Sequence, residues 1–389
     1  MPDDTIGGAA GAGEPAESDG RTAHIAGREL PDEDVFVPEE RPKPRSLRLI
    51  YFVLGLGLFV TALGLMRSGA ADLTSTLRGS VFTDNPWSTL GLGWLGACIV
   101  LSGSPVAASS LSLLDGGAID RPAAFTMLVG SRLGAAFVVL VVGVLYALRR
   151  TNSGGRRAPI SIGILSLVMT FLAYVPAGAI GYFVLEAGAF DGLDIGTSPS
   201  LTSATTALFG WAVDLVETIL PGWALFPAGV LVLLAGFKLF DEVMPSIGSE
   251  RLEDRPRAWR ERKWPMFLVG CGVTLLTLSV AVSLTLLVPL VAKGHLRRAN
   301  TLPYIAGANI TTLVDTLVAA ILLGNQDAVR IVAAIATAVA IWTVLLLLLA
   351  YPLVRRACLG IARRALLSPP RLAAFTGVLL GVPVALIAV

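Results

Sequence analysis

Among the polar side chains of the apolar segment 301–323 are four whose types suit the binding of a cation. They are Asn309, Thr311, Thr312 and Asp315, in a stretch that is otherwise mostly hydrophobic. Each of these groups costs free energy in hydrocarbon unless a partner or a ligand satisfies it. Amide, hydroxyl and carboxylate oxygens together form a hard-oxygen site that suits sodium. A buried carboxylate is equally suited to carrying a proton, so proton coupling through Asp315 stays open.

Arg132 is the unusual cation of an earlier apolar segment, 123–148. Its planar guanidinium can hold an oxyanion through two parallel hydrogen bonds, which would suit phosphate. Alternatively, Arg132 has a structural role and pairs with a carboxylate such as Asp315. The residues leave both roles open. They also leave three for Asp315, which can bind sodium, carry a proton or neutralise Arg132.

The two polar segments belong to a sequence repeat. Gly117 precedes Gly130 by thirteen residues, and Gly294 precedes Gly307 by the same interval (130 − 117 and 307 − 294). The two copies are 177 positions apart (307 − 130). A repeated hydrophobic unit with polar interruptions is typical of secondary transporters.

The composition predicts an all-α polytopic membrane protein. Hydrophobic residues make up 54% of the chain and charged residues only 15%. Apolar runs long enough to cross a bilayer recur, and they give about seven full spans plus two hairpins. The three cysteines and two histidines are too scattered for a metal cluster or a disulfide framework. Without a nucleophile–base pair the chain is not expected to be an enzyme. We expect no cofactor beyond sodium or protons as coupling ions, no metal beyond a sodium site, and no nucleic-acid partner.

Two apolar stretches, 88–114 and 264–290, are predicted to enter the membrane and return as re-entrant helical hairpins. The first is interrupted by Ser102-Gly103-Ser104-Pro105, where Gly favours non-helical geometry and Pro removes a backbone donor. If this stretch crossed the membrane fully, the arginines at 149, 150, 156 and 157 would face the outside. A hairpin leaves them in the cytoplasm, as the positive-inside rule requires.

The same rule predicts that the two repeats are inverted. Basic residues directly before the span 49–66 place the N-terminus in the cytoplasm, so this span runs outward. Its copy at 223–240 precedes the strongly basic stretch 251–263 and therefore runs inward. We expect a multi-pass protein of the plasma membrane, in contact with the lipid bilayer. The sequence does not indicate its oligomeric state.

These features divide the chain into five parts. The first part is polar, with few large apolar residues, and is predicted to be a disordered cytoplasmic tail. The linker carries an amphipathic pattern over 205–220 that predicts a surface helix, with a further span as the alternative. The parts are the tail 1–46, repeat 1 at 47–200, the linker 201–222, repeat 2 at 223–354, and a basic loop with a C-terminal transmembrane helix at 355–389.

The repeat motifs resemble those of the type II sodium/phosphate cotransporter family. Members carry two inverted repeats, each with a hairpin bearing Gln-Ser-Ser-Ser-Ala-Thr-Thr and a later Gly-Ala-Asn-Ile-Gly-Thr-Thr. The later motif is matched by Gly307-Ala308-Asn309-Ile310-Thr311-Thr312, one Gly short, and more weakly by Gly130-Ser131-Arg132-Leu133-Gly134. The hairpin motifs are degenerate, because both glutamines are leucines here, Leu101 and Leu278, and the first Asn is Arg132. The resemblance in layout extends over 48–354.

This resemblance implies sodium-coupled phosphate symport by alternating access, with inorganic phosphate bound where the two hairpin tips meet. By position it assigns substrate binding to Ser102, Ser104, Ser279 and Ser283, beside Arg132. Broken helices there would offer unpaired amide donors to an oxyanion. Alternatively, each serine bonds back to its own helix. Two other functions stay open, which are transport of another small anion with sodium or proton coupling, and a non-transporting role as a sensor or assembly protein.

Overall fold

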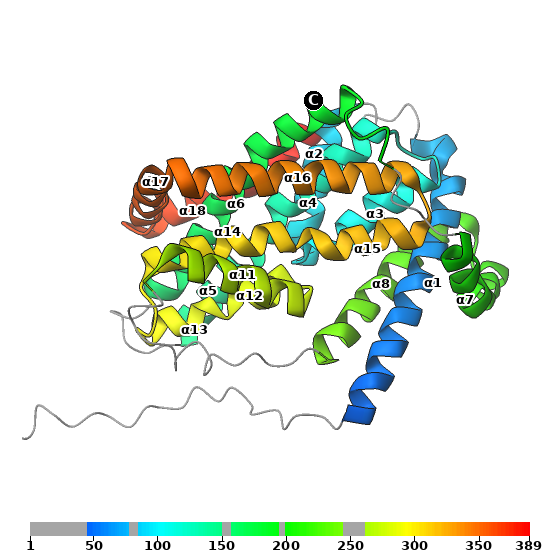
Figure 1. Cartoon of the computed structure of the whole chain (residues 1–389), viewed down its shortest axis with the longest axis horizontal. Helices are drawn as coiled ribbons and strands as arrows, with labels where there is room; N and C mark the ends of the chain where they lie inside the picture. The colour runs from blue at the N-terminus through cyan, green and yellow to red at the C-terminus, as the bar shows by residue number, and fades with distance from the viewer. Residues whose placement is uncertain (1–44, 78–84, 150–156, 194–198, 244–260) are drawn as a thin grey trace, which may run out of the picture. The chain divides into compact units, whose positions relative to one another are not determined.

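The computed structural model describes residues 45–77, 85–149, 157–193, 199–243 and 261–389 (Figure 1). All regular structure in these ranges is helical, so the predicted all-α class is confirmed. Almost all of the predicted tail, and the basic stretch from 251 to 260, lie outside the described residues.

Seven helical stretches in the described ranges are long and apolar enough to cross a membrane, which agrees with the predicted number. Five of them are single helices, and the other two consist of helices in series. The stretches are α1 (Arg45–Leu77), α4 (Arg121–Ala135) with α5 (Phe137–Arg149), α6 (Arg157–Glu186), α8 (Gly222–Val243), η1 (Arg298–Asn300) with α14 (Thr301–Thr311) and α15 (Leu313–Leu323), α16 (Gln326–Leu349) and α18 (Pro369–Ile387). The chain is therefore a polytopic membrane protein.

The first broken segment consists of α2 (Pro86–Val100) and α3 (Gly103–Asp115), with the break at Leu101. Leu101 adopts a left-handed backbone conformation with φ 58°. Gly96 and Val106 lie close together across this break, since a Cβ atom on Gly96 would be 3.5 Å from Cγ1 of Val106.

The second broken segment repeats this geometry in α11 (Lys263–Thr277), α12 (Val280–Thr285) and α13 (Leu287–Ala292). Leu278 has φ 47°. Thr274, before the break, donates a hydrogen bond of 2.7 Å to Ser283 after it. Leu101 and Leu278 are the non-glycine residues with positive φ in the described ranges, and they are 177 positions apart (278 − 101). The period of the sequence repeat therefore recurs in the backbone.

Glycines allow each broken segment to lie directly against the helix that follows it. A Cβ atom on Gly130 would lie 2.1 Å from the carbonyl oxygen of Leu90, so α4 approaches α2 through backbone contact. A Cβ atom on Gly307 would lie 2.2 Å from the carbonyl oxygen of Phe267, so α14 approaches α11 in the same way. Small residues at helix contacts are how membrane helices achieve close packing. Close helix packing therefore explains why glycine occurs at both positions of the repeat.

The C-terminal end of α3 is tied to two other elements. Asp115 lies 3.0 Å from Nε of Arg67 in α1, and its Oδ1 accepts a 2.9 Å hydrogen bond from Nδ2 of Asn325. Asn325 also caps α16, since its Oδ1 accepts hydrogen bonds from the backbone amides of Asp327 and Ala328. One asparagine side chain therefore serves both the cap of α16 and the end of α3.

A helix, α7 (Pro199–Ile219), occupies the linker where a surface helix was predicted, although it begins before residue 205. It is not among the seven stretches that could span a membrane. Phe209 and Val213 of α7 face Gly57 and Gly64 of α1. Four of its large apolar side chains are instead exposed, namely Leu208, Trp211, Leu215 and Ile219. A helix lying on a membrane surface would have such a face.

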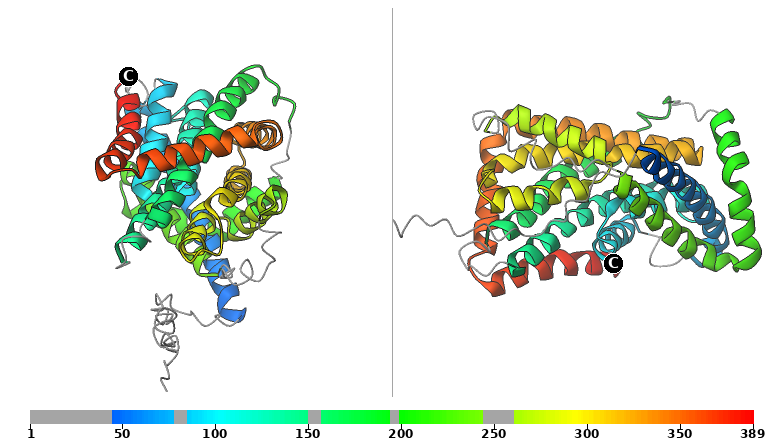
Figure 2. Two further views of the ribbon diagram at one scale, coloured as in Figure 1. Left: turned by 90° about the vertical axis from the view of Figure 1, so that its left-hand side faces the viewer. Right: turned by 90° about the horizontal axis from the view of Figure 1, so that it is seen from below.

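The prediction that a basic loop follows residue 354 is wrong. Residues Tyr351–Ala365 form helix α17, which crosses the ends of neighbouring helices at a steep angle (Figure 2). Its buried residues recur at intervals of three or four, whereas the arginines between them are exposed. The arginines were interpreted as a loop, whereas they form the exposed face of an amphipathic helix. The buried residues are Val354, Cys358, Ala362 and Ala365, and the exposed arginines are Arg355, Arg356, Arg363 and Arg364.

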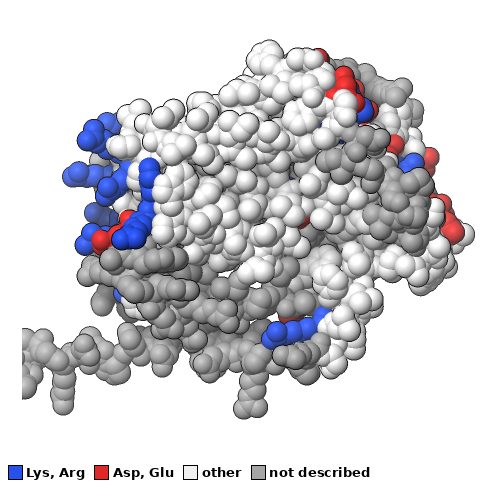
Figure 3. Space-filling model, viewed as in Figure 1, with Lys and Arg blue, Asp and Glu red and all other residues white. Residues whose placement is uncertain are grey.

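On the face drawn in Figure 3, charged residues gather at the left and right ends, with a smaller and mainly basic group at the lower edge. Lys and Arg gather at the end where α17 lies, and acidic residues predominate at the opposite end. A largely uncharged band separates them, over the length of α16 and α15. This distribution is typical of a membrane protein.

Candidate functional site: a buried polar cluster between the repeats

Arg132 in α4 is buried, and its guanidinium reaches across to the junction of α14 and α15. Its Nη1 donates a 3.1 Å hydrogen bond to Oγ1 of Thr312. Its Nη2 lies 3.4 Å from Oδ1 of Asp315 and also donates to Oγ1 of Thr316. Asp315 is buried too, with 6% of its surface exposed. Arg132 and Asp315 thus form a buried ion pair that joins the two copies of the repeat.

The cluster satisfies only part of the hydrogen-bonding capacity of this pair. Thr316 donates a 2.9 Å hydrogen bond to Oδ1 of Asp315. Among the described residues, Oδ2 of Asp315 and Nε of Arg132 have no hydrogen-bond partner. Each unsatisfied buried polar atom costs about 1–3 kcal/mol. The pair therefore keeps one carboxylate oxygen and one guanidinium donor available for other partners.

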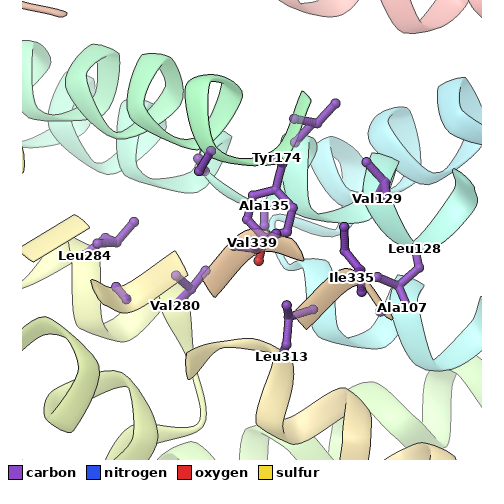
Figure 4. Packing of buried hydrophobic residues seen from close by; sticks show 14 of the residues in the cluster. Ala107, Leu128, Val129, Ala135, Tyr174, Val280, Leu284, Leu313, Ile335 and Val339 are labelled. Atoms are coloured by element: carbon purple, nitrogen blue, oxygen red, sulfur yellow. The ribbon is translucent and has the colours of Figure 1, made fainter. Parts of the chain in front are cut away.

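Asn309, one turn before this junction, is held by α6. Its side-chain Oδ1 accepts a 3.2 Å hydrogen bond from Thr170, and its backbone oxygen accepts one of 2.6 Å from the hydroxyl of Tyr174. Tyr174 belongs to the same buried hydrophobic cluster as residues of α3, α4, α12, α15 and α16 (Figure 4). Asn309 thus braces α14 against α6.

The two threonines predicted to bind a cation point in different directions. Thr312 lies between α14 and α15 and accepts the hydrogen bond from Arg132. Thr311 is half-buried, and its hydroxyl donates at 3.3 Å to the carbonyl oxygen of Gly307 in its own helix. Of the predicted cation-binding set, the structure brings Thr312 and Asp315 together around Arg132.

The four serines assigned by the resemblance lie at the two breaks. Ser279 accepts a 3.3 Å hydrogen bond from the backbone amide of Val282, which caps α12. Ser283 is buried and bonded to both Thr274 and the hydroxyl of Tyr304, so its oxygen is used within the fold.

The serines of the first break are engaged differently. Ser102 precedes α3, and its side chain makes no capping hydrogen bond. Ser104 is buried in the first turn of α3. The adjacent Gly103 lies against Ser131 and Ala135 of α4, so these serines are close to the helix that carries Arg132.

Three residues of the cluster escaped the sequence reasoning. Thr316 directly follows Asp315, and its hydroxyl could have been noticed as one more polar group in the same apolar span. Thr170 and Tyr174 lie in α6, far from Asn309 in sequence, and no local pattern links them to it.

The helical fold and this buried polar cluster define a class, the polytopic membrane proteins with a polar site between repeated segments. Within that class, residues 232–367 match the sequence model of the Na+/Pi-cotransporter family. The matched part contains the second break, Asn309, Thr312 and Asp315. The family recognised from the motif at residue 307 is therefore confirmed, and it is a family of transporters rather than enzymes. No match was found to a curated protein or to a solved structure.

Proposed function

We propose that this protein is a secondary active transporter that couples the movement of inorganic phosphate to sodium by alternating access. The Na+/Pi-cotransporter segment at residues 232–367 supports this class of activity. The observation that carries the mechanism is the Arg132–Asp315 pair, buried between the two copies of the repeat.

The two charged groups of this pair match the two charges that a sodium/phosphate symporter must bind. Asp315, Thr312 and Thr316 together offer oxygen ligands to a cation, and at present the guanidinium of Arg132 is their cationic partner. A sodium ion that took over these oxygens would release Arg132. The released guanidinium would then bind phosphate in the bidentate geometry that arginine favours.

Electrostatics makes this exchange cooperative. Sodium alone would leave Arg132 buried without a counter-charge, and phosphate alone would leave Asp315 in that condition. An uncompensated buried charge costs about 3–5 kcal/mol, so each ligand favours the binding of the other. Because such coupling is reciprocal, sodium must raise phosphate affinity by the same factor as phosphate raises sodium affinity.

The two broken segments are the elements that would move to expose the site alternately to each side of the membrane. Leu101 and Leu278 occupy equivalent positions in the two repeats. In our proposal the repeats are inverted in the membrane and each broken segment is re-entrant, so that rocking one repeat against the other opens the site to each side in turn. In our proposal the exposed arginines of α17 face the cytoplasm, as they would in a plasma-membrane protein.

Uptake by proteoliposomes tests this function. The purified protein is reconstituted, and entry of radiolabelled phosphate is measured with an inward sodium gradient, with potassium replacing sodium, and with an inward proton gradient alone. We expect uptake that requires sodium and is saturated by phosphate. Uptake driven by protons alone would replace sodium with proton coupling. Sodium-dependent uptake that sulfate or another anion inhibits better than phosphate would change the substrate. No uptake of any tested anion would point to a sensor or assembly role.

A further inference from the structure

A cavity lies at the basic end of the molecule, separate from the Arg132 cluster. It measures about 520 Å³ and is formed where α6, η1 and α17 meet. Its size falls in the range typical of sites for small ligands, roughly 300–1,000 Å³. Its described lining consists of three basic residues, five apolar residues and one serine, with no acidic residue.

Three arginines from three different elements line this cavity. Arg157 begins α6, Arg298 belongs to η1, and Arg363 lies in α17. All three side chains are exposed, so they can orient towards a ligand. Like charges around one cavity repel each other, and an anion placed between them relieves that repulsion. Guanidinium groups recognise phosphate oxygens through paired hydrogen bonds.

The rest of the lining, apart from the serine, is apolar. Leu359 of α17 contributes to it, together with Leu366 and Leu367 directly after that helix. Leu165 of α6, which is fully buried, also lines the cavity. A free inorganic anion makes no use of leucines, whereas a phosphate group attached to an acyl chain contacts both kinds of surface. Basic pockets between membrane helices on the cytoplasmic side are known sites for anionic lipid headgroups.

We propose that this cavity binds a phosphate group, which is presented by an anionic phospholipid whose glycerol and upper acyl carbons lie along the leucines. The same three arginines would also accept inorganic phosphate, so the two sources share one recognition chemistry. By linking η1 and α6 to α17, the bound phosphate would hold α17 against the ends of the spanning helices.

A matched pair of triple variants tests this site. Arg157→Gln, Arg298→Gln and Arg363→Gln together remove the three charges that line the cavity. Arg355→Gln, Arg356→Gln and Arg364→Gln remove three exposed charges of α17 that lie outside the cavity. Native mass spectrometry counts lipids retained from bilayers of phosphatidylglycerol and phosphatidylcholine. Equilibrium dialysis with radiolabelled inorganic phosphate measures the second source.

We expect the wild type and the control variant to retain phosphatidylglycerol in preference to phosphatidylcholine. The cavity variant should lose this preference, with an affinity lower by about a hundredfold for three charges. Loss of inorganic phosphate binding alone would support the site with the free anion as ligand. Phosphate binding that persists in the cavity variant belongs to the Arg132 cluster.

Two results would overturn the proposal. One is that the wild type and the cavity variant bind both probes equally, and the other is that both triple variants lose binding to the same extent. If the cavity variant does not fold, the single variants Arg298→Gln and Arg363→Gln replace it, and each should weaken lipid retention several-fold. Unchanged retention in both single variants would likewise exclude the site.

Discussion

Leu101 and Leu278, 177 positions apart (278 − 101), share a left-handed backbone conformation that leucine rarely adopts. For a residue with a Cβ atom this conformation costs roughly 1–2 kcal/mol. Each leucine lies at the break between two consecutive helices. The repeat has therefore kept a strained turn in both copies, and this turn is a feature that substitution can test.

At Leu278 we expect polarity to matter less than backbone conformation. Leu278→Asn should be tolerated, because Asn adopts positive φ readily, whereas Leu278→Ile should lower stability by about 1–2 kcal/mol. Thermal unfolding in detergent measures both variants. The control is Leu276, exposed in the helical part of α11, where Ile should be the better-tolerated residue. The same order at both positions would refute the strained turn.

Removing one partner of the Arg132–Asp315 pair should be costly. We expect Asp315→Asn to destabilise the fold by about 3–5 kcal/mol, because it leaves the guanidinium buried and unpaired. Combining it with Arg132→Gln should restore much of the loss. Arg121 and Asp327, 3.6 Å apart and partly exposed, serve as the control pair, and Arg121→Gln should cost less than about 1 kcal/mol. Additive losses in the buried double variant would show that the pair is not coupled.

Asp315→Asn should also change the cation dependence of transport more than the affinity for phosphate. The carboxylate contributes the charge of the proposed sodium site, whereas phosphate contacts Arg132 in the proposed exchange. Uptake is measured against sodium concentration, pH and phosphate concentration in proteoliposomes. An active variant with sodium and pH curves like those of the wild type would remove Asp315 from the coupling mechanism.

A methyl group at Gly307 should disrupt the contact between α14 and α11. The added Cβ would lie 2.2 Å from the carbonyl oxygen of Phe267, and the backbone cannot give way cheaply. We expect Gly307→Ala to destabilise the protein by about 1–3 kcal/mol. Gly272→Ala in α11 is the control, because a Cβ there meets nothing within 4 Å. Equal melting temperatures for the two variants would contradict the close approach.

The thiol of Cys358 reports on whether α17 is packed as described. Burial raises the pKa of Cys358 to about 12, because it disfavours the thiolate. At pH 8 only about one thiol in ten thousand is then ionised, and maleimide should react very slowly. The measurement uses a variant with Cys98 and Cys271 replaced by alanine, and labelling in SDS gives the accessible rate. Fast labelling of the folded protein at pH 8 would mean that this face of α17 is open.

Local patterns were sufficient to predict the spans, the breaks near residues 101 and 278, and the pairing of Arg132 with Asp315 as one of two alternatives. They depend on hydrophobic run length, Gly and Pro, and the high cost of a lone charge in an apolar segment. Helix α17 was missed because four arginines outweighed its apolar spacing. The brace from Thr170 and Tyr174 to Asn309 could not be predicted, since it depends on how α6 packs against α14.

Because the side chain of Asn325 both caps α16 and donates to Asp115 at the end of α3, one substitution can remove the second contact and keep the first. Aspartate at this position would still accept the amide hydrogens that begin α16, and its charge would favour that helix end. It could no longer donate to Asp115, and the two carboxylates would repel each other across the present 2.9 Å contact. Asn325→Asp therefore dissociates the integrity of α16 from the attachment of α3. The substitution would thereby change the position of the first broken segment while the N-terminus of α16 stays capped.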